Sequence, residues 1–298
     1  MPDSEARPHP SSFCLFPADR PFRLGPRTLA RCVAFGLLAL AGCVTRPGAA
    51  AFARSSQVSV SYGLEGADII YIAEKHDEAF HHQFQEKIIR SLRRRGKPVT
   101  VGMEMIDLTQ QAALDDYLDK RISWNEFVRR TAFDRGWGRT SPAYARILSW
   151  CRRNEVPVIA LNAPQKVTRK LARNEPLTAE EKRLVPSYPE PPGGFKQFQT
   201  AMAGHANAGS LGCYYEAQRA WDQTMAGRIL AFLPNHSGTL VVLLGRFHAD
   251  PWTGVPWYVA RRSHVTQVIL FPARDPGSPS ALQGLGKSPD RREADPRS

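Results

Sequence analysis

Two histidines and one glutamate, His76, Glu104 and His248, each lie at or just after the end of a short apolar run. Neutral imidazoles together with a carboxylate are the ligand set of a divalent metal such as zinc, manganese or iron. The same groups could instead transfer protons without a metal, because histidine titrates near neutral pH. These three residues are therefore our candidates for a metal site or for acid–base catalysis.

Other polar residues near the same runs are weaker candidates for a functional site. Asn162 ends a fourth apolar run, but asparagine is equally typical of a simple turn. His81 and His82 follow His76 closely. They could face the same site, or they could be a solvated pair on the surface of a helix.

The apolar runs themselves predict β-strands that alternate with helical patterns. Such alternation favours an α/β fold with a mostly parallel β-sheet, flanked by helices on both faces and carrying helical insertions. In an open parallel sheet, ligands bind just outside the carboxyl ends of the strands. We therefore expect His76, Glu104 and His248 to meet at one edge of the sheet. The predicted strands are 68–73, 99–105, 156–161, 239–244 and 265–271.

Helical patterns fill most of the sequence between these strands. Asp77 is the expected N-cap of the first helix, and Thr178 with Glu181 forms a capping-box pattern at the start of a later one. Residues 186–212 are rich in proline and glycine, so we expect a long loop there. The predicted helices are 78–95, 108–119, 123–131, 142–154, 164–173, 178–185 and 214–232.

Aromatic residues gather in the last third of the sequence. Helical spacing places Tyr214, Gln218, Trp221 and Met225 on one face of the last predicted helix, which is typical of an ordinary core face. Three more aromatic residues follow His248, and apolar walls with few polar anchors suit large flat ligands. These three residues are Trp252, Trp257 and Tyr258.

Composition narrows the class of protein. The chain has 298 residues, 42% hydrophobic and 23% charged, which excludes a wholly disordered chain, a collagen or a long coiled coil. The formal net charge of +12 suits nucleic acid, anionic lipid or an acidic ligand. Its arginines are scattered, so we do not expect nucleic-acid binding. Cys151 and Cys213 stand too far apart for a metal motif, and we expect two buried thiols.

The N-terminal region is typical of an export signal. The run 32–42 is uncharged, mostly apolar and preceded by four arginines, and it is too short to cross a bilayer as a helix. It ends in Leu-Ala-Gly-Cys, which resembles the lipobox of bacterial lipoproteins, where the cysteine is acylated. We therefore predict a signal peptide over 1–43 with Cys43 lipidated. A linker over 44–60, a single domain over 61–271 and a disordered tail over 272–298 complete the predicted organisation.

Five segments of the predicted domain resemble the ChaN-like haem-binding lipoproteins, within the wider group that includes Tiki, TraB and erythromycin-esterase-type proteins. The segments span nearly the whole domain in the expected order. The first motif departs from the family's pattern at one position, where Ala73 replaces the usual glycine. Its methyl group could restrict the approach of a ligand or metal. The matching segments are IAEKHDEAFHH (72–82), VGMEM (101–105), ALNAP (160–164), YYEAQRAWDQTMA (214–226) and LLGRFHADPWTGVPWYVARR (243–262).

The resemblance implies a lipoprotein of the bacterial outer membrane that faces the periplasm, binds haem and takes part in iron uptake without turnover. It implies Tyr214, Tyr215 or His205 as the axial ligand of the haem iron, because phenolate and imidazole are known haem ligands. It also implies a possible homodimer and a TonB-dependent outer-membrane receptor as partner. Basic residues suited to the haem propionates are Lys75, Arg246, Arg261 and Arg262.

A second function stays open from the same resemblance. The Tiki and esterase relatives suggest a metal-dependent hydrolase that would use His76, Glu104 and His248. In that case the same three residues would be both metal ligands and catalytic groups.

Overall fold

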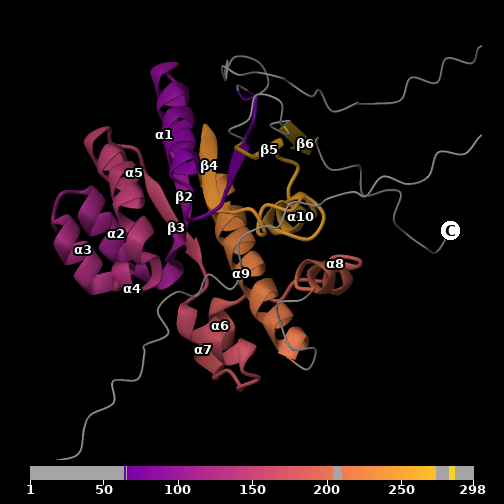
Figure 1. Ribbon diagram of the computed structural model, residues 1–298. Coiled ribbons are helices and arrows are strands. Elements are labelled where there is room, and N and C mark those ends of the chain that lie inside the picture. The colour runs from indigo at the N-terminus through magenta and orange to yellow at the C-terminus, as the bar shows by residue number, and fades with distance from the viewer. Residues whose placement is uncertain (1–63, 65, 204–209, 273–281, 286–298) are drawn as a thin grey trace, which may run out of the picture.

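A computed structural model describes residues 64, 66–203, 210–272 and 282–285, and its centre is a six-stranded sheet (Figure 1). The strand order is β3-β2-β4-β1-β5-β6. The first five strands are parallel, and β6 pairs antiparallel with β5. The predicted α/β fold with a mostly parallel sheet is confirmed. The strands are β1 (Ile69–Glu74), β2 (Val99–Asp107), β3 (Val158–Asn162), β4 (Thr239–Gly245), β5 (Gln267–Leu270) and β6 (Leu282–Leu285).

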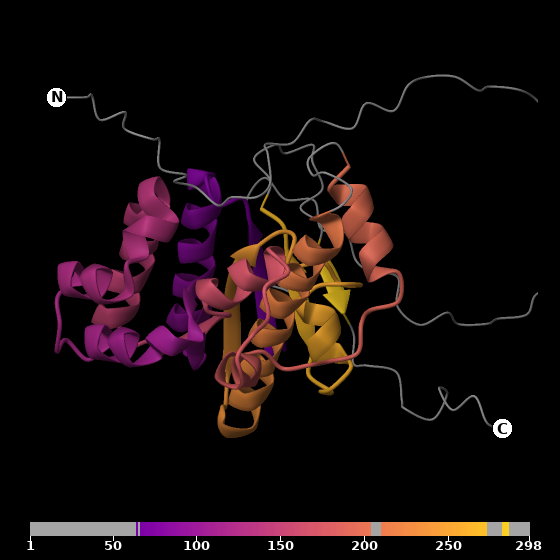
Figure 2. The same ribbon diagram turned by 90° about the horizontal axis from the view of Figure 1, so that it is seen from below.

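Helices cover both faces of the sheet (Figures 1 and 2). Because strand side chains alternate, Ile70 and Ile72 of β1 join one buried apolar cluster, whereas Tyr71 and Ala73 join the other. The first cluster is completed by five helices, and the second by two. The first five are α1 (Ala79–Arg94), α2 (Gln111–Leu118), α3 (Trp124–Thr131), α4 (Phe133–Trp137) and α5 (Ser141–Arg153); the other two are α9 (Leu211–Phe232) and α10 (Val255–Ala260).

Two of the remaining helices contact α9, and α7 is joined to α6 by the pair Lys170–Glu181. Helix α6 packs directly on α9, and α8 makes fewer contacts with it. The capping box predicted at the start of α7 is present, with Thr178 and Glu181 each bonding the other's backbone N–H. The bounds are α6 (Gln165–Ala172), α7 (Ala179–Leu184) and α8 (Gly194–Ala201), and short 3-10 turns occur at Leu108–Gln110, Gly138–Thr140 and Leu233–Asn235.

The predicted strands agree with the structure to within two residues at each end, but three helices were not predicted. Helix α8 lies inside the expected loop 186–212, and it begins at a pair of glycines that sequence reasoning takes as a turn. Helix α10 carries a proline in its first turn, where the missing N–H costs nothing. Helix α4 has only five residues. The N-cap of α1 is Glu78 rather than Asp77.

Much of the predicted organisation of the chain ends lies outside the described residues. The signal peptide, Cys43, the linker and residues 273–281 and 286–298 of the predicted tail belong to this part. Strand β6 lies within the predicted tail and extends the sheet. Among the helices of the described residues, none combines the length and the apolar character that crossing a membrane requires.

Candidate functional site at the carboxyl edge of the sheet

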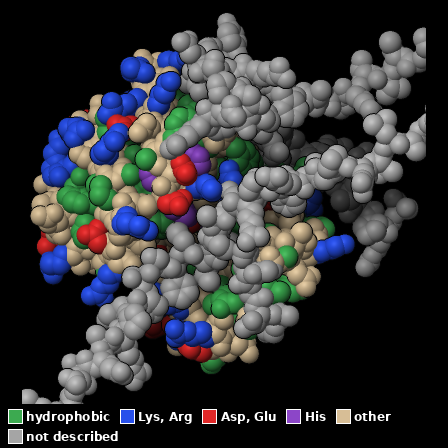
Figure 3. Space-filling model, in the orientation of Figure 1, with side chains coloured by type: hydrophobic (Ala, Val, Ile, Leu, Met, Phe, Trp, Pro, Cys, Tyr) green, Lys and Arg blue, Asp and Glu red, His purple; other side chains and the backbone are tan. Residues whose placement is uncertain are grey.

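The three candidate residues meet at the carboxyl edge of the sheet. Strands β1, β4 and β2 are neighbours, so the segments that follow them emerge side by side. Nε2 of His76 lies 3.8 Å from Oε1 of Glu104, and Nε2 of His248 lies 3.5 Å from the same oxygen. His, acidic and basic side chains gather near the centre of the face shown in Figure 3. The predicted convergence of the two imidazoles on one carboxylate is therefore present.

His248 is oriented by helix α9. Its Nδ1 lies 2.6 Å from Oδ1 of Asp222 and 3.0 Å from Nε2 of Gln218. Gln218 also donates to Oδ2 of Asp222 at 3.1 Å. All three side chains are buried. The helix thus fixes the ring of His248 so that its other nitrogen faces Glu104.

His76 is oriented from the opposite helical layer. Its Nδ1 lies 2.7 Å from Oε1 of Glu74, the fully buried last residue of β1. Tyr144 of α5 and Gln85 of α1 both donate hydrogen bonds to the carboxylate of Glu74. A chain of alternating carboxylates and imidazoles therefore runs from α9, over the edge of the sheet, to α1 and α5.

Two small residues leave room for this row of carboxylates and imidazoles. A Cβ on Gly245 would lie 2.9 Å from Nε2 of His76, and the N–H of Gly245 donates to Oε2 of Glu104 at 2.5 Å. Ala73, the departure from the family pattern, is buried in the apolar cluster on the α9 side of the sheet. Its methyl group therefore packs into the core and does not block the approach to His76.

The surrounding charges shift the pKa values of both histidines. Burial alone would lower the pKa of His76, but the hydrogen bond with Glu74 and the charges of Glu104 and Glu74 raise it to about 9. Burial likewise opposes protonation of His248, yet the carboxylates of Glu104 and Asp222 outweigh it and raise its pKa. Glu74 is also buried, but its bond to His76 holds its pKa below the usual value.

The neighbouring histidines are buried, so a solvated surface pair is excluded. Nδ1 of His81 accepts the backbone N–H of Lys75 at 2.8 Å, which fixes the turn that carries His76. The ring of His82 packs on Tyr144, with centroids 4.9 Å apart. Asn162 does not join the site, because its side chain accepts the N–H of the next residue, as in a simple turn.

The predicted metal site at His76, Glu104 and His248 gains no support from the structure. Among the described residues, no group of three or more His, Cys, Asp or Glu side chains is arranged to hold a metal ion. One ring nitrogen of each histidine already contacts a carboxylate, and the two other nitrogens face a single carboxylate oxygen. Glu74 and Asp222 instead hold and orient the two imidazoles.

The two candidate tyrosines differ sharply in their surroundings. Tyr215 is buried between Phe195 and Phe198, and its hydroxyl donates to Oε1 of Glu190 at 2.8 Å. Burial raises the pKa of Tyr215 well above its usual value, and the bond to Glu190 adds to the effect. Tyr214 is half-buried and its hydroxyl makes no hydrogen bond to any described residue.

Tyr214 belongs to a small apolar cluster between α8 and the start of α9. The buried members of this cluster are Phe198, Met202, Leu211 and Tyr215, and Tyr214 and Phe247 pack against them. Phe247 directly precedes His248, so the cluster adjoins the carboxyl edge of the sheet. The predicted core face of α9 is present in part, since Met225 is fully buried but Gln218 is bonded to His248.

The other predicted ligand-binding residues are dispersed. Trp252 is 68% exposed at a turn whose N–H groups are held by Asp250. The guanidinium of Arg262 stacks 3.8 Å from the ring centre of Tyr188 and donates to a backbone carbonyl. Arg246 follows β4 directly, beside the edge of the sheet. His205 lies outside the described residues.

Sequence reasoning missed the groups that orient the histidines, namely Glu74, Gln85, Tyr144 and Asp222. A signal existed for two of them. Glu74 stands two residues before His76, and Asp222 follows Gln218 by one helical turn. Tyr144 and Gln85 reach the site only through the packing of α5 and α1 on the sheet, and no local pattern marks them.

The fold and this edge define an α/β protein that carries a polar cluster where ligands bind in open parallel sheets. The family described as haem-binding uptake, Tiki superfamily, ChaN matches residues 61–259. The chain belongs to this family. The match covers β1 to β4 and reaches α10, including every residue of the polar cluster, whereas β5 and β6 lie beyond it.

A solved structure has a similar fold. A solved structure of cofacial haem binding to ChaN of Campylobacter jejuni superposes with a TM-score of 0.56, 22% identity, and coverage of 75% of this chain and 89% of that one. At this identity the likeness shows the fold. An erythromycin esterase in its open conformation is 14% identical with a TM-score of 0.42, covering 75% and 77% of the two chains, which supports no inference about function.

One curated relative comes from a plant. The chloroplastic protein RETICULATA-RELATED 5 of Arabidopsis thaliana is 27% identical over 258 residues, covering 76% of this chain. The chain spans only 33% of that protein's length, so the two proteins share one part and not their whole architecture.

Proposed function

We propose that the protein binds haem at the apolar cluster between α8 and α9, with Tyr214 as the ligand of the iron. The observation that carries this proposal is the hydroxyl of Tyr214, which makes no hydrogen bond within the described part of the chain and lies beside an aromatic and apolar wall. Phenolate is a known axial ligand, and a flat macrocycle requires apolar surface of this kind. Membership of a haem-binding uptake family supports haem rather than another flat ligand.

Tyr215 is the weaker candidate for the iron ligand. Its hydroxyl already donates to Glu190, and its raised pKa opposes the phenolate that iron would need. Its ring also fills the space between Phe195 and Phe198. We therefore assign it to the wall of the site.

A haemin titration of the purified protein tests the proposal. The wild-type protein should give a shifted Soret band, and Tyr214→Phe should weaken binding by about tenfold or more and move the band. Tyr215→Phe is the matched control, because it removes the same atom one position away and should keep the wild-type spectrum. Equal spectra for wild type and Tyr214→Phe would contradict the assignment of the ligand, and no Soret shift in the wild type would contradict haem binding.

We further propose that the protein is a lipoprotein of the bacterial outer membrane that faces the periplasm and takes part in haem uptake. The apolar run followed by Cys43 supports acylation. A TonB-dependent receptor is the partner expected for such a protein, and a homodimer is its expected assembly. Cys43→Ser should release the protein from the membrane fraction without changing its Soret titration. Unchanged membrane association of this variant would contradict the anchor.

A further inference from the structure

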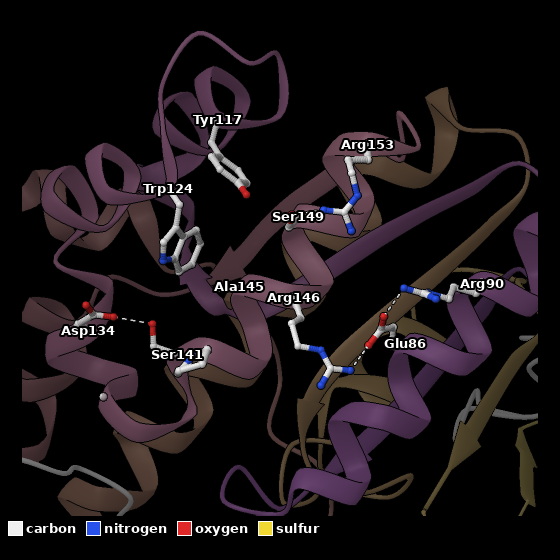
Figure 4. Close-up of a pocket in the computed structure, with 12 residues that line it drawn as sticks. Glu86, Arg90, Tyr117, Trp124, Asp134, Ser141, Ala145, Arg146, Ser149 and Arg153 are labelled. Carbon is white, nitrogen blue, oxygen red and sulfur yellow. Dashed lines mark hydrogen bonds and ion pairs between the residues drawn. The ribbon is translucent and has the colours of Figure 1, made fainter.

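A cavity of about 670 Å³ opens between helices α1 to α5 (Figure 4). Its size falls in the range of small-molecule sites, roughly 300 to 1,000 Å³. Every residue that lines it lies between positions 86 and 153, whereas the proposed haem cluster lies between positions 198 and 247. Neither the haem proposal nor the polar cluster at the edge of the sheet uses this cavity.

The cavity as a whole carries an excess of positive charge. Three guanidinium groups line it, those of Arg90, Arg146 and Arg153, against the carboxylates of Glu86 and Asp134. Glu86 is already shared, because Arg90 contacts it at 2.5 Å and Arg146 at 2.6 Å. Two carboxylates facing three guanidinium groups leave a local surplus of one positive charge.

Arg153 is the guanidinium that supplies this surplus. It donates to the hydroxyl of Ser149 at 2.6 Å and pairs with no carboxylate of the described residues. The acid at the opposite end, Asp134, is occupied by the hydroxyl of Ser141 at 2.5 Å. In addition, the Nε atom of Arg90 is buried without an acceptor in the described part of the chain. The cavity is therefore suited to bind an anionic group.

The opposite side of the cavity is a rigid aromatic wall. The rings of Tyr117 and Trp124 lie 5.7 Å apart, and Trp124 is held from behind by Phe127 and Phe133 at 5.4 and 5.6 Å. Figure 4 shows Tyr117 and Trp124 on one side and the three arginines on the other. A fixed aromatic face favours a planar apolar group, because little side-chain entropy is lost when the two stack.

We propose that this cavity binds a small aromatic carboxylate, with its ring against Trp124 and its carboxylate on Arg153. The planar guanidinium group matches the two oxygens of a carboxylate, and the hydroxyl of Ser149 lies beside it. The surplus of one positive charge fits a monoanion better than a phosphate monoester, which carries nearly two negative charges at neutral pH. This inference does not depend on the haem proposal.

Calorimetric titration of the full chain with 1-naphthoate tests the inference. Its neutral counterpart 1-naphthamide has nearly the same shape and should bind about tenfold more weakly, the ratio that corresponds to loss of one charge-assisted contact. Arg153→Gln should weaken naphthoate binding by a similar factor. Arg129→Gln is the matched control, since Arg129 is an exposed arginine of α3 that pairs with Glu126 outside the cavity. The Arg129→Gln variant should bind naphthoate with the affinity of the wild type.

Glu86→Gln should change the affinity for naphthoate in the opposite direction. Removing its charge frees Arg90 and Arg146 from their shared partner, so naphthoate should bind several-fold more tightly. Absence of binding at millimolar naphthoate, equal affinity for naphthamide, or equal loss in Arg153→Gln and Arg129→Gln would each overturn the inference. Tighter binding of 1-naphthyl phosphate than of naphthoate would overturn the choice of a carboxylate. Tyr214→Phe should leave every one of these affinities unchanged.

Discussion

Nδ1 of His248 and Oδ1 of Asp222 lie 2.6 Å apart, so the histidine that follows β4 takes its orientation from helix α9. The same relation holds in the opposite layer between His76 and Glu74, at 2.7 Å. Both rings then present their remaining nitrogen to Glu104. Three buried carboxylates and two imidazoles thus link the two helical layers across the edge of the sheet, and the neighbouring carboxylates raise the pKa values of both histidines.

Asp222→Asn should lower the pKa of His248. Burial opposes the charged imidazolium, and the carboxylates of Glu104 and Asp222 are what raise its pKa. Removing one of these charges shifts the balance toward the neutral ring. An NMR titration of the His248 ring measures this change. Asp119→Asn, an exposed acid on the surface that pairs with Arg121, should leave the titration unchanged. An unchanged pKa in Asp222→Asn would contradict the electrostatic account.

The stability of the protein should fall as the pH rises from about 6.5 to about 9. The pKa of His76 is about 9 in the folded protein and near 6.5 when unfolded, so the folded state holds its proton more tightly. The stabilisation is complete below pH 6.5 and is lost as the pH rises through 9. Urea unfolding at pH 6.5, 7.5 and 9 should show a loss on the order of 1–3 kcal/mol. His76→Gln should remove most of this pH dependence, and an equally steep dependence in that variant would contradict the assignment.

Glu74→Gln should destabilise the fold by about 3 kcal/mol, because it removes the fully buried carboxylate that partners the half-buried imidazolium of His76. The carboxylate of Glu74 is fully buried and also accepts hydrogen bonds from Gln85 and Tyr144. Tyr144→Phe removes only one of these bonds and should cost less, about 1–2 kcal/mol. Denaturant unfolding measures both variants. Glu126→Gln, a change in a half-buried acid whose ion pairs lie at the surface, provides the control and should change stability by well under 1 kcal/mol. Equal costs for Glu74→Gln and Glu126→Gln would be inconsistent with a buried carboxylate at Glu74.

The sheet and the meeting of His76, Glu104 and His248 could be predicted from sequence because both depend on local patterns. Continuous apolar runs mark buried parallel strands, and whatever follows such strands must emerge at one edge. The bounds of the predicted strands agree with the structure to within two residues, and the three residues meet at one edge of the sheet. The direction in which Ala73 points follows from the same alternation, since its neighbours Ile72 and Glu74 face the other side of the sheet.

The partners of the two histidines could not be predicted in the same way. Tyr144 lies 70 positions from Glu74, and Asp222 lies 26 positions from His248. Their contacts are set by how helices pack on the sheet, which no short pattern encodes. Helix α8 was missed for a different reason, because the pair of glycines at its start and the prolines before it outweigh its short apolar face.

Gly245→Ala should disrupt the polar cluster without disturbing the sheet elsewhere. Gly245 is the last residue of β4, and its φ is ordinary, so the glycine is required for space and not for backbone conformation. A methyl group there would lie 2.9 Å from Nε2 of His76 and 3.5 Å from Oε2 of Glu104. Because His76 is held by Glu74, its ring has little room to retreat. We expect a loss of about 1–3 kcal/mol in the free energy of unfolding, the usual cost of overpacking.

Gly136→Ala is the matched control for this substitution. An added Cβ at Gly136, in helix α4, would meet nothing within 4 Å. Alanine should therefore be neutral there or stabilise the helix by up to about 1 kcal/mol. Denaturant unfolding compares the two variants, and an NMR titration of His76 in Gly245→Ala should show its pKa moved from about 9 toward 6.5, because the methyl group separates the ring from Glu104. If Gly245→Ala were as stable as Gly136→Ala and kept the His76 titration of the wild type, the close packing of His76 against β4 would be wrong.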